Sequence, residues 1–311
     1  MSSFLNSISS VLVILLMTAA GYIFGARKWM VAEYKPFLEK YLMFLAIPCA
    51  TVDGFLKNIS PELLRGSWRI LVISTSALII CSLLSFLLAY LLRLPRNRAG
   101  AFIGMGGFSN ALFVGYPMCR ELFGDESVPY VMLFFLCLSI LIFIVCYAGF
   151  AWFSGTENKI GRDRIVKIFV NPPVISAIVG VLMVIFGLTF PRPLNSLLGY
   201  VSATVSPLAL FYCGFVIYEF GIKNIRIDRG IAVASVMRFV AAPLICAALC
   251  RLLGVSAPAS SVLVVEISMP VVTVLVVMAK EWDADVQYAA VGIVLTTLAC
   301  FVVVPVLMLF I

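Results

Sequence analysis

The polar side chains able to do chemistry in this chain are few, and they stand within long apolar segments. Asn110 follows a run rich in glycine, and Glu266 is the clearest acidic residue deep inside an apolar segment. A carboxylate away from water is costly, so Glu266 is expected to be protonated, paired or bound to a cation. Asn110 could bind a substrate directly, or it could join two helices by a hydrogen bond. Arg238 could pair with Glu266, or its long stem could carry the charge to the surface.

Two of these apolar segments contain residues that disfavour a continuous helix. The first, 104–117, holds four glycines and ends on Pro117, and the second holds Pro270. Because proline lacks an N–H and clashes with the preceding turn, both helices are expected to break, although the prolines could instead only kink them. Unwound backbone in a membrane requires protein or a water-filled cavity around it, and the free N–H groups of a half-helix suit an anion. The candidate substrate-binding residues are Ser109, Asn110, Thr51, Pro117, Ser268, Pro270 and Thr273.

The composition indicates that lipid surrounds most of this chain. Of its 311 residues, 63% are hydrophobic and 12% are charged, whereas a soluble domain carries about 25% charged residues. The net charge of +7 comes from basic residues in short loops, which argues for a membrane topology signal and against nucleic-acid binding. The chain has nine cysteines but no C-x-x-C pair and no histidine, so no metal site and no cofactor are expected.

Ten apolar runs are long enough to cross a bilayer as helices. Alternate loops between these runs carry fifteen and six Lys and Arg residues, while Arg238 lies within a run. By the positive-inside rule, both termini are expected outside the cytoplasm. Gly21 and Gly25 in the first run have the spacing for close helix contact. The predicted runs are 8–25, 37–55, 69–92, 100–123, 128–153, 171–190, 195–219, 230–252, 259–280 and 286–310.

The two halves of the chain repeat one another at an offset near 160 residues. Matched positions include Tyr41 and Tyr200, Pro48 and Pro207, Gly54 and Gly214, and Arg120-Glu121 and Lys280-Glu281. The predicted organisation is a first five-helix repeat at 1–153, a cytoplasmic linker at 154–170 and a second repeat at 171–311. Because each repeat has an odd number of spans, the second would be inverted, as in many alternating-access transporters.

Specific motifs give the whole chain a resemblance to a known family. They are Asn110 through Gly124, Met269 through Trp282, the pair Asn171-Pro172, and Arg238-Phe239 with Pro243. On these motifs the sequence resembles the auxin efflux carrier family, which includes the plant PIN-FORMED and PIN-LIKES carriers and bacterial malate and malonate permeases. Ser109 stands where the plant carriers have a proline. Glu266 stands near a position that is neutral in those carriers, which favours an ion-coupling role here.

The resemblance implies an all-α fold of ten helices like that of the bile acid sodium symporters. Spans 1, 2, 6 and 7 would form a scaffold and homodimer interface, and spans 3–5 and 8–10 would form a mobile transport domain. Broken helices 4 and 9 would cross at the site, and an elevator-like motion would carry organic anions across the membrane. Asn171 would open the sixth span, and the protein would reside in a bacterial cell membrane.

The leading functional hypothesis is a non-enzymatic transporter of small organic anions, such as indole carboxylates or dicarboxylates like malate. Proton coupling through Glu266 is preferred, while sodium coupling and uniport are alternatives. A non-transporting membrane sensor is a second hypothesis, but the chain shows no docking segment for a signalling partner. A lipid-modifying enzyme is disfavoured because no histidine and no dense cluster of acidic or metal-ligating residues occurs.

Overall fold

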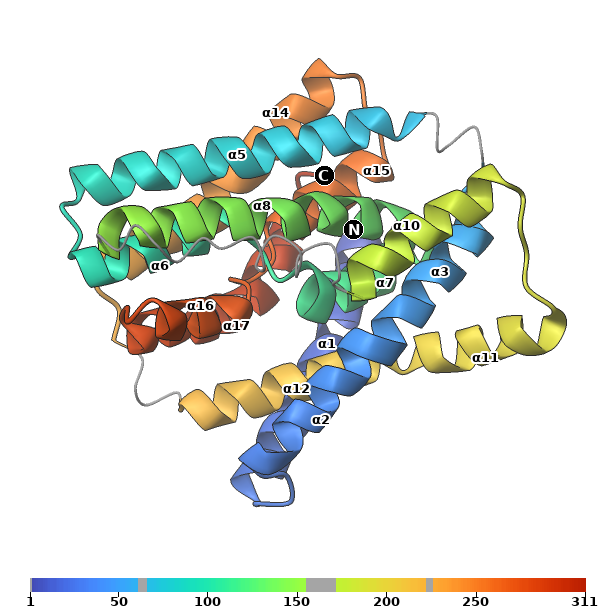
Figure 1. The fold of residues 1–311 in the computed structure, drawn as a ribbon, viewed down its shortest axis with the longest axis horizontal. Coiled ribbons are helices and arrows are strands. Elements are labelled where there is room, and N and C mark those ends of the chain that lie inside the picture. The colour runs from blue at the N-terminus through green and yellow to red at the C-terminus, as the bar shows by residue number, and fades with distance from the viewer. Residues whose placement is uncertain (1, 61–65, 155–171, 222–225) are drawn as a thin grey trace.

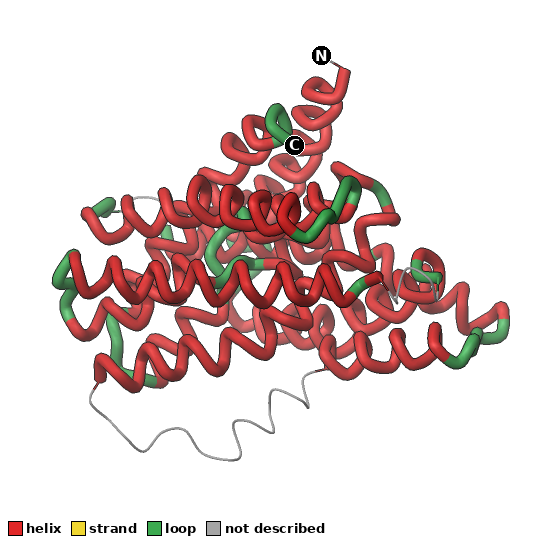
Figure 2. Tube along the Cα trace, turned by 90° about the horizontal axis from the view of Figure 1, so that it is seen from above, coloured by secondary structure: helices red, strands yellow, loops and turns green. Residues whose placement is uncertain are grey.

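The computed structural model describes residues 2–60, 66–154, 172–221 and 226–311, and these residues are predominantly helical. Within them, the single isolated β-bridge joins Ser109 to Val271. Figure 2 shows helices joined by short loops and turns. Asn171 and the predicted linker at 154–170, apart from Ser154, lie outside the described residues.

The helices of the N-terminal half are α1 (Ser2–Ala26), α2 (Lys35–Tyr41), α3 (Ile47–Asn58), α5 (Trp68–Leu91), α6 (Arg96–Gly107), α7 (Tyr116–Phe123) and α8 (Val128–Ser154). Those of the C-terminal half are α10 (Pro172–Ile185), α11 (Arg192–Ala203), α12 (Val205–Phe220), α13 (Arg229–Val236), α14 (Ala242–Leu252), α15 (Ala259–Ile267), α16 (Val274–Glu281) and α17 (Val286–Leu307).

Five described helical stretches are long and apolar enough to cross a membrane. They are Trp68–Leu91, Asp125–Phe153, Arg192–Phe220, Arg229–Leu252 and Val286–Leu307. Large apolar side chains such as Leu83, Trp152 and Leu244 are exposed on them, which is the pattern of helices whose solvent is lipid. Every predicted run carries helix, either as one helix or as two in succession. The count of ten spans stays a prediction.

Three short π-helical turns interrupt the regular helices, and a proline follows each of them. The turns are η2 (Leu42–Ala46), η3 (Ala111–Gly115) and η6 (Met237–Ala241), and the prolines are Pro48, Pro117 and Pro243. Each proline occupies the first or second position of the α-helix that follows its turn, where a missing N–H is tolerated. Pro117 therefore does not itself break its helix, contrary to the expectation from sequence.

The helices pack in two sets of neighbours. In the first set, α1 contacts α12, and α3 contacts α10 and α11; in the second, α5, α6 and α8 contact one another and α14 contacts α5 and α15. The close approach predicted at Gly21 is confirmed, because a Cβ there would lie 1.9 Å from the Phe211 carbonyl oxygen of α12. Helix ends recur at the predicted offset: α6 ends at Gly107 and α15 ends at Ile267, 160 residues later.

Candidate anion site at the two helix interruptions

The two breaks predicted from sequence lie against each other near the middle of the molecule (Figure 1). After α6 ends, residues 108–110 are not helical, and the same holds for 268–273 after α15. The Asn110 N–H donates to the Pro270 carbonyl at 2.7 Å, and the Val272 N–H donates to the Phe108 carbonyl at 3.3 Å. Each interruption thus supplies hydrogen-bond partners to the other, as unwound backbone away from water requires.

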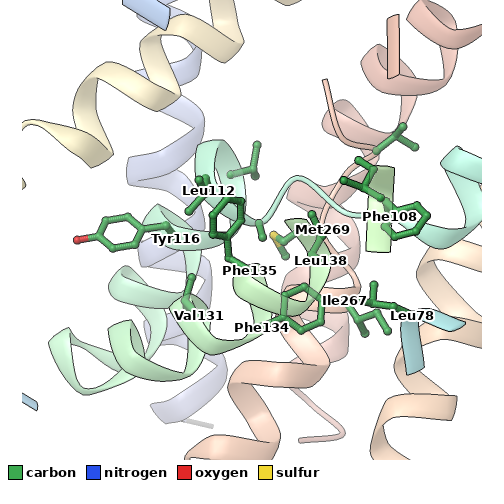
Figure 3. Packing of buried hydrophobic residues seen from close by; sticks show 14 of the residues in the cluster. Leu78, Phe108, Leu112, Tyr116, Val131, Phe134, Phe135, Leu138, Ile267 and Met269 are labelled. Carbon is green, nitrogen blue, oxygen red and sulfur yellow. The ribbon is translucent and has the colours of Figure 1, made fainter. Parts of the chain in front are cut away.

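The side chains that pack around this crossing are largely apolar. Phe108, Ile267 and Met269 belong to the interruptions or border them, while Phe135 and Leu138 come from α8 (Figure 3). All five are buried. The crossing is therefore held in a dry, packed environment, where a polar group without a partner is costly.

A cavity of about 120 Å³ lies beside the crossing. Its polar lining comes from Ser109, Asn110, Ser139 and Thr273, and apolar residues of α8 close another part of it. We call this cavity the crossing chamber. Its lining contains no charged side chain among the described residues, so any charge on a ligand there would have to be balanced by hydrogen-bond donors and helix ends.

Two helix N-termini meet at the crossing chamber. Ala111 begins η3, which leads into α7, and Thr273 precedes α16, which begins at Val274. The first N–H groups of a helix have no intrahelical acceptor. Among the described residues, no acceptor is found for the N–H groups of Ala111, Leu112, Thr273 or Val274. All four residues line the chamber, so both positive helix ends face one cavity.

Polar side chains in the chamber also lack partners. The hydroxyl oxygens of Ser109 and Ser139 are buried and make no hydrogen bond with the described residues. Asn110 caps η3 by accepting the Phe113 N–H at 3.2 Å through Oδ1, and no described acceptor bonds its Nδ2. A native structure rarely leaves such groups unpaired. Together with the free N–H groups, they form a set of donors suited to an anion with several acceptor oxygens.

Glu266 lies behind the chamber instead of in its lining. Its side chain is fully buried in α15, Oε1 accepts a hydrogen bond from the Cys119 thiol at 3.3 Å, and Oε2 has no partner among the described residues. The carboxyl group packs directly on Gly115, where a Cβ would lie 2.4 Å from Oε2. Glu266 therefore touches η3 and α7, the segments that carry one of the two chamber-facing helix ends.

Arg238 is fully buried, so the expectation that its charge reaches the surface is wrong. It lies in η6 and donates two hydrogen bonds to the Met105 carbonyl, from Nε at 3.1 Å and from Nη2. A third, from Nη1 to the Ile267 carbonyl, measures 3.1 Å. The alternative that Arg238 pairs with Glu266 is also wrong, because no ion pair between described residues joins them.

Other predicted site residues do not line the chamber. Thr51 is buried in α3, where its hydroxyl donates to the Ile47 carbonyl at 2.8 Å. The Ser268 hydroxyl donates to the Val264 carbonyl at 2.6 Å, and Pro270 contributes its carbonyl to the crossing. Sequence reasoning missed Ser139, although a serine within the apolar run 128–153 was a usable signal.

A second cavity of about 240 Å³ shares Met43, Phe113, Thr273 and Val274 with the crossing chamber. Charged and polar groups of α2 and α12 stand at this cavity: Lys35 pairs with Glu219 at 2.7 Å, and the Tyr212 hydroxyl donates to Glu39. The Phe113 ring lies 5.4 Å from that of Tyr212. Phe113 and Met43 therefore separate the chamber from a larger, partly polar space.

Comparison with known proteins places the chain among transport proteins. A family model described as "Membrane transport protein" matches residues 6–308. An uncharacterized transporter of Methanocaldococcus jannaschii is 26% identical over 299 residues, which cover 92% of this chain and 93% of the relative. An uncharacterized transporter of Methanothermobacter thermautotrophicus is 26% identical over 307 residues, 97% of each chain. A protein of Rhizobium meliloti named "Putative malonate transporter" is 23% identical over 273 residues, 86% of this chain and 83% of the relative.

Proposed function

This integral membrane protein belongs to the membrane transport protein family, that of the auxin efflux carriers, and we propose that it carries a small organic anion through the crossing chamber. The observation that carries this proposal is the convergence of two helix N-termini and two buried hydroxyls, unpaired among the described residues, on one cavity. Free N–H groups at helix ends bind carboxylates and phosphates through hydrogen bonds and the positive end of the helix dipole.

The size and lining of the chamber favour a small carboxylate. A cavity of about 120 Å³ suits a short dicarboxylate such as malonate or malate. An indole carboxylate would also need the neighbouring cavity of about 240 Å³, which requires displacement of Phe113 or Met43. One relative is named for malonate, so malonate is the first substrate to test.

The transport mechanism we propose is an elevator-like motion of one helix set against the other. The recurrence of helix ends 160 residues apart supports two inverted repeats of five spans. The set α1, α2, α3, α10, α11 and α12 would form the scaffold and a homodimer interface, while the helices α5–α8 and α13–α17 would move. Both termini would lie outside the cytoplasm, so Lys35 and the larger cavity would face the cytoplasmic side.

Glu266 is our candidate for coupling transport to a proton. Its one polar partner among the described residues is a thiol, which is a weak donor, so its surroundings fit the neutral acid better than a carboxylate. When ionised, it would place a negative charge behind the helix end that faces the substrate. Sodium would need several further oxygen ligands around the carboxyl group, and it is the second choice for that reason.

The experiment compares wild type with Glu266→Gln, which imitates the protonated acid. Purified protein in liposomes is assayed for accumulation of labelled malonate under imposed pH, sodium and voltage gradients, and for malonate exchange without gradients. We expect wild-type accumulation to follow the pH gradient, and the variant to exchange malonate but not accumulate it. Accumulation that follows the sodium gradient would show that sodium, and not the proton, is the coupling ion. Wild-type flux that ignores both gradients, with an identical variant, would make the protein a uniporter and remove Glu266 from coupling.

A further inference from the structure

Arg238 has no acidic partner among the described residues to balance its charge. A buried guanidinium away from water is costly unless hydrogen bonds and opposite charge compensate it. The structure has no ion pair from Arg238 to any described carboxylate, and its three hydrogen bonds all go to backbone carbonyls. The compensating charge must therefore come from the backbone.

Both acceptor carbonyls lie at the C-terminal ends of interrupted helices. Met105 stands in the last turn of α6, which ends at Gly107, and Ile267 is the last residue of α15. Carbonyls in the last turn have no intrahelical donor, and each helix C-terminus carries about half a negative charge. Two such ends together supply about one negative charge, which matches the single positive charge of Arg238.

The same hydrogen bonds connect the two halves of the chain. Met105 is 133 residues from Arg238 in sequence and Ile267 is 29 residues from it, yet one planar group reaches both. Met105 lies four positions before Ser109, and Ile267 lies four positions before Val271, the two residues joined by the β-bridge. Arg238 therefore links the two helices immediately before the segments that cross and line the chamber.

We propose that Arg238 is a positioning residue for anion binding, because it ties the C-terminal ends of α6 and α15 together and so keeps the N–H groups of η3 and α16 directed at one chamber. This inference rests on the proposed function for its ligand, but the geometry it asserts can be measured without one. Lysine keeps the charge, yet its single ammonium lacks the fixed fork of donors that spans two carbonyls. Arg238→Lys should loosen the crossing without removing the charge.

The ligand-independent test uses a disulfide between the two interruptions. Ser109 and Val271 form a non-hydrogen-bonded antiparallel pair, because the hydrogen bonds are made by the residues on either side of them. The Cα atoms of such a pair lie about 4.5 Å apart, which is within the range that a disulfide can bridge. The double variant Ser109→Cys/Val271→Cys should cross-link rapidly in membranes with native Arg238. With Arg238→Lys added, the yield at a fixed time of oxidation should fall several-fold. Equal yields would overturn the proposal whatever the substrate is.

The binding test uses malonate and purified full-length protein. We expect Arg238→Lys to weaken malonate binding about tenfold or more. The double variant Ser109→Cys/Val271→Cys is then oxidised in two backgrounds, with Arg238→Lys and with native Arg238. Once cross-linked, the two proteins should bind malonate with affinities within about threefold of each other. A purely structural defect elsewhere would not be rescued at the crossing. Arg251→Lys, an exposed change in the same helical stretch, is the matched control and should bind normally.

The outcomes separate the two proposals. If native protein binds no carboxylate but the cross-linking yield still depends on Arg238, the positioning role stands and the proposed function fails. If native protein binds malonate and Arg238→Lys binds it equally well, the positioning role is wrong. Should Arg238→Lys fail to purify as a monodisperse protein, the cross-link must restore its recovery, and failure to do so also overturns the positioning role.

Discussion

Replacing Gly115 by alanine is expected to disturb Glu266 without adding an atom to the lining of the crossing chamber. The new methyl carbon would lie 2.4 Å from Oε2, 2.6 Å from Oε1 and 2.8 Å from Cδ of Glu266. These separations are shorter than the roughly 3.5–4.0 Å of an optimal contact between non-bonded atoms. Because the Glu266 side chain is fully buried, it cannot swing into solvent, and the carboxyl group or η3 must shift.

The expected magnitude combines two opposing effects. Overpacking of a tightly packed interior costs about 1–3 kcal/mol. Gly115 has a helical backbone, with φ of −63° and ψ of −50°, so alanine there gains about 0.5–1 kcal/mol from its lower entropy cost. The net destabilisation should be about 0–2.5 kcal/mol. Gly66→Ala is the matched control, since nothing lies within 4 Å of a Cβ at that position.

Thermal unfolding of the purified variants and their pH-driven malonate accumulation would be measured together. We expect Gly115→Ala to melt below wild type and to lose accumulation more than exchange, while Gly66→Ala behaves as wild type or melts slightly higher. Shortening the acid in Gly115→Ala/Glu266→Asp should recover part of the stability, because it withdraws the carboxyl group from the new methyl. If Gly115→Ala matches Gly66→Ala in both measurements, the carboxyl group does not lie against Gly115 and the reasoning is refuted.

Four other measurements probe the chamber and the topology. Asn110→Ala should weaken malonate binding by about 1–3 kcal/mol with folding retained, measured by calorimetry against the exposed control Asn195→Ala; unchanged affinity would remove Asn110 from the site. Ser139→Ala removes a hydroxyl that has no partner among the described residues, so it should leave the melting temperature of the ligand-free protein unchanged or raised and reduce the stabilisation that malonate provides; undiminished stabilisation would contradict this. Cysteine introduced at Ser3 should react with an impermeant label from outside the cell and cysteine at Ile160 should not, the reverse pattern overturning the topology. Malonate should bind with uptake of about one more proton or cation than acetate, measured by calorimetry in buffers of different ionisation enthalpy and at varied sodium; equal uptake would contradict the charge balance of the chamber.

The features that sequence could predict are those decided by local backbone chemistry. The glycine-rich run that ends on Pro117, and Pro270 in the second half, indicated two interrupted helices, and the structure has both. The position of the first break was less accessible, because the π-turn η3 shifts Pro117 into the start of α7. A local pattern shows that a helix will be disturbed, but the turn that accommodates its proline depends on packing.

The partners of the buried charges could not be read from sequence. Arg238 and Glu266 lie in adjacent predicted runs and have opposite charges, which made their pairing a reasonable alternative. In the structure Arg238 instead donates to backbone carbonyls of residues 133 and 29 positions away. Every residue has a backbone carbonyl, so no residue type in the sequence identifies these two as the acceptors. Ser139 was missed for a related reason, since only the fold brings α8 to the crossing.

The charges around the crossing give a reason for ion coupling that does not depend on any single hydrogen bond. The C-terminal ends of α6 and α15 are compensated by Arg238, whereas the N-terminal ends of η3 and α16 face the chamber without a compensating side chain among its described lining. Each of these ends carries about half a positive charge, so the chamber is matched to about one negative charge. A monocarboxylate satisfies this balance, and a dicarboxylate exceeds it by about one charge unless a proton or cation enters with it. An ionised Glu266 behind η3 would oppose this attraction, so we expect Glu266 to be protonated when the chamber holds an anion.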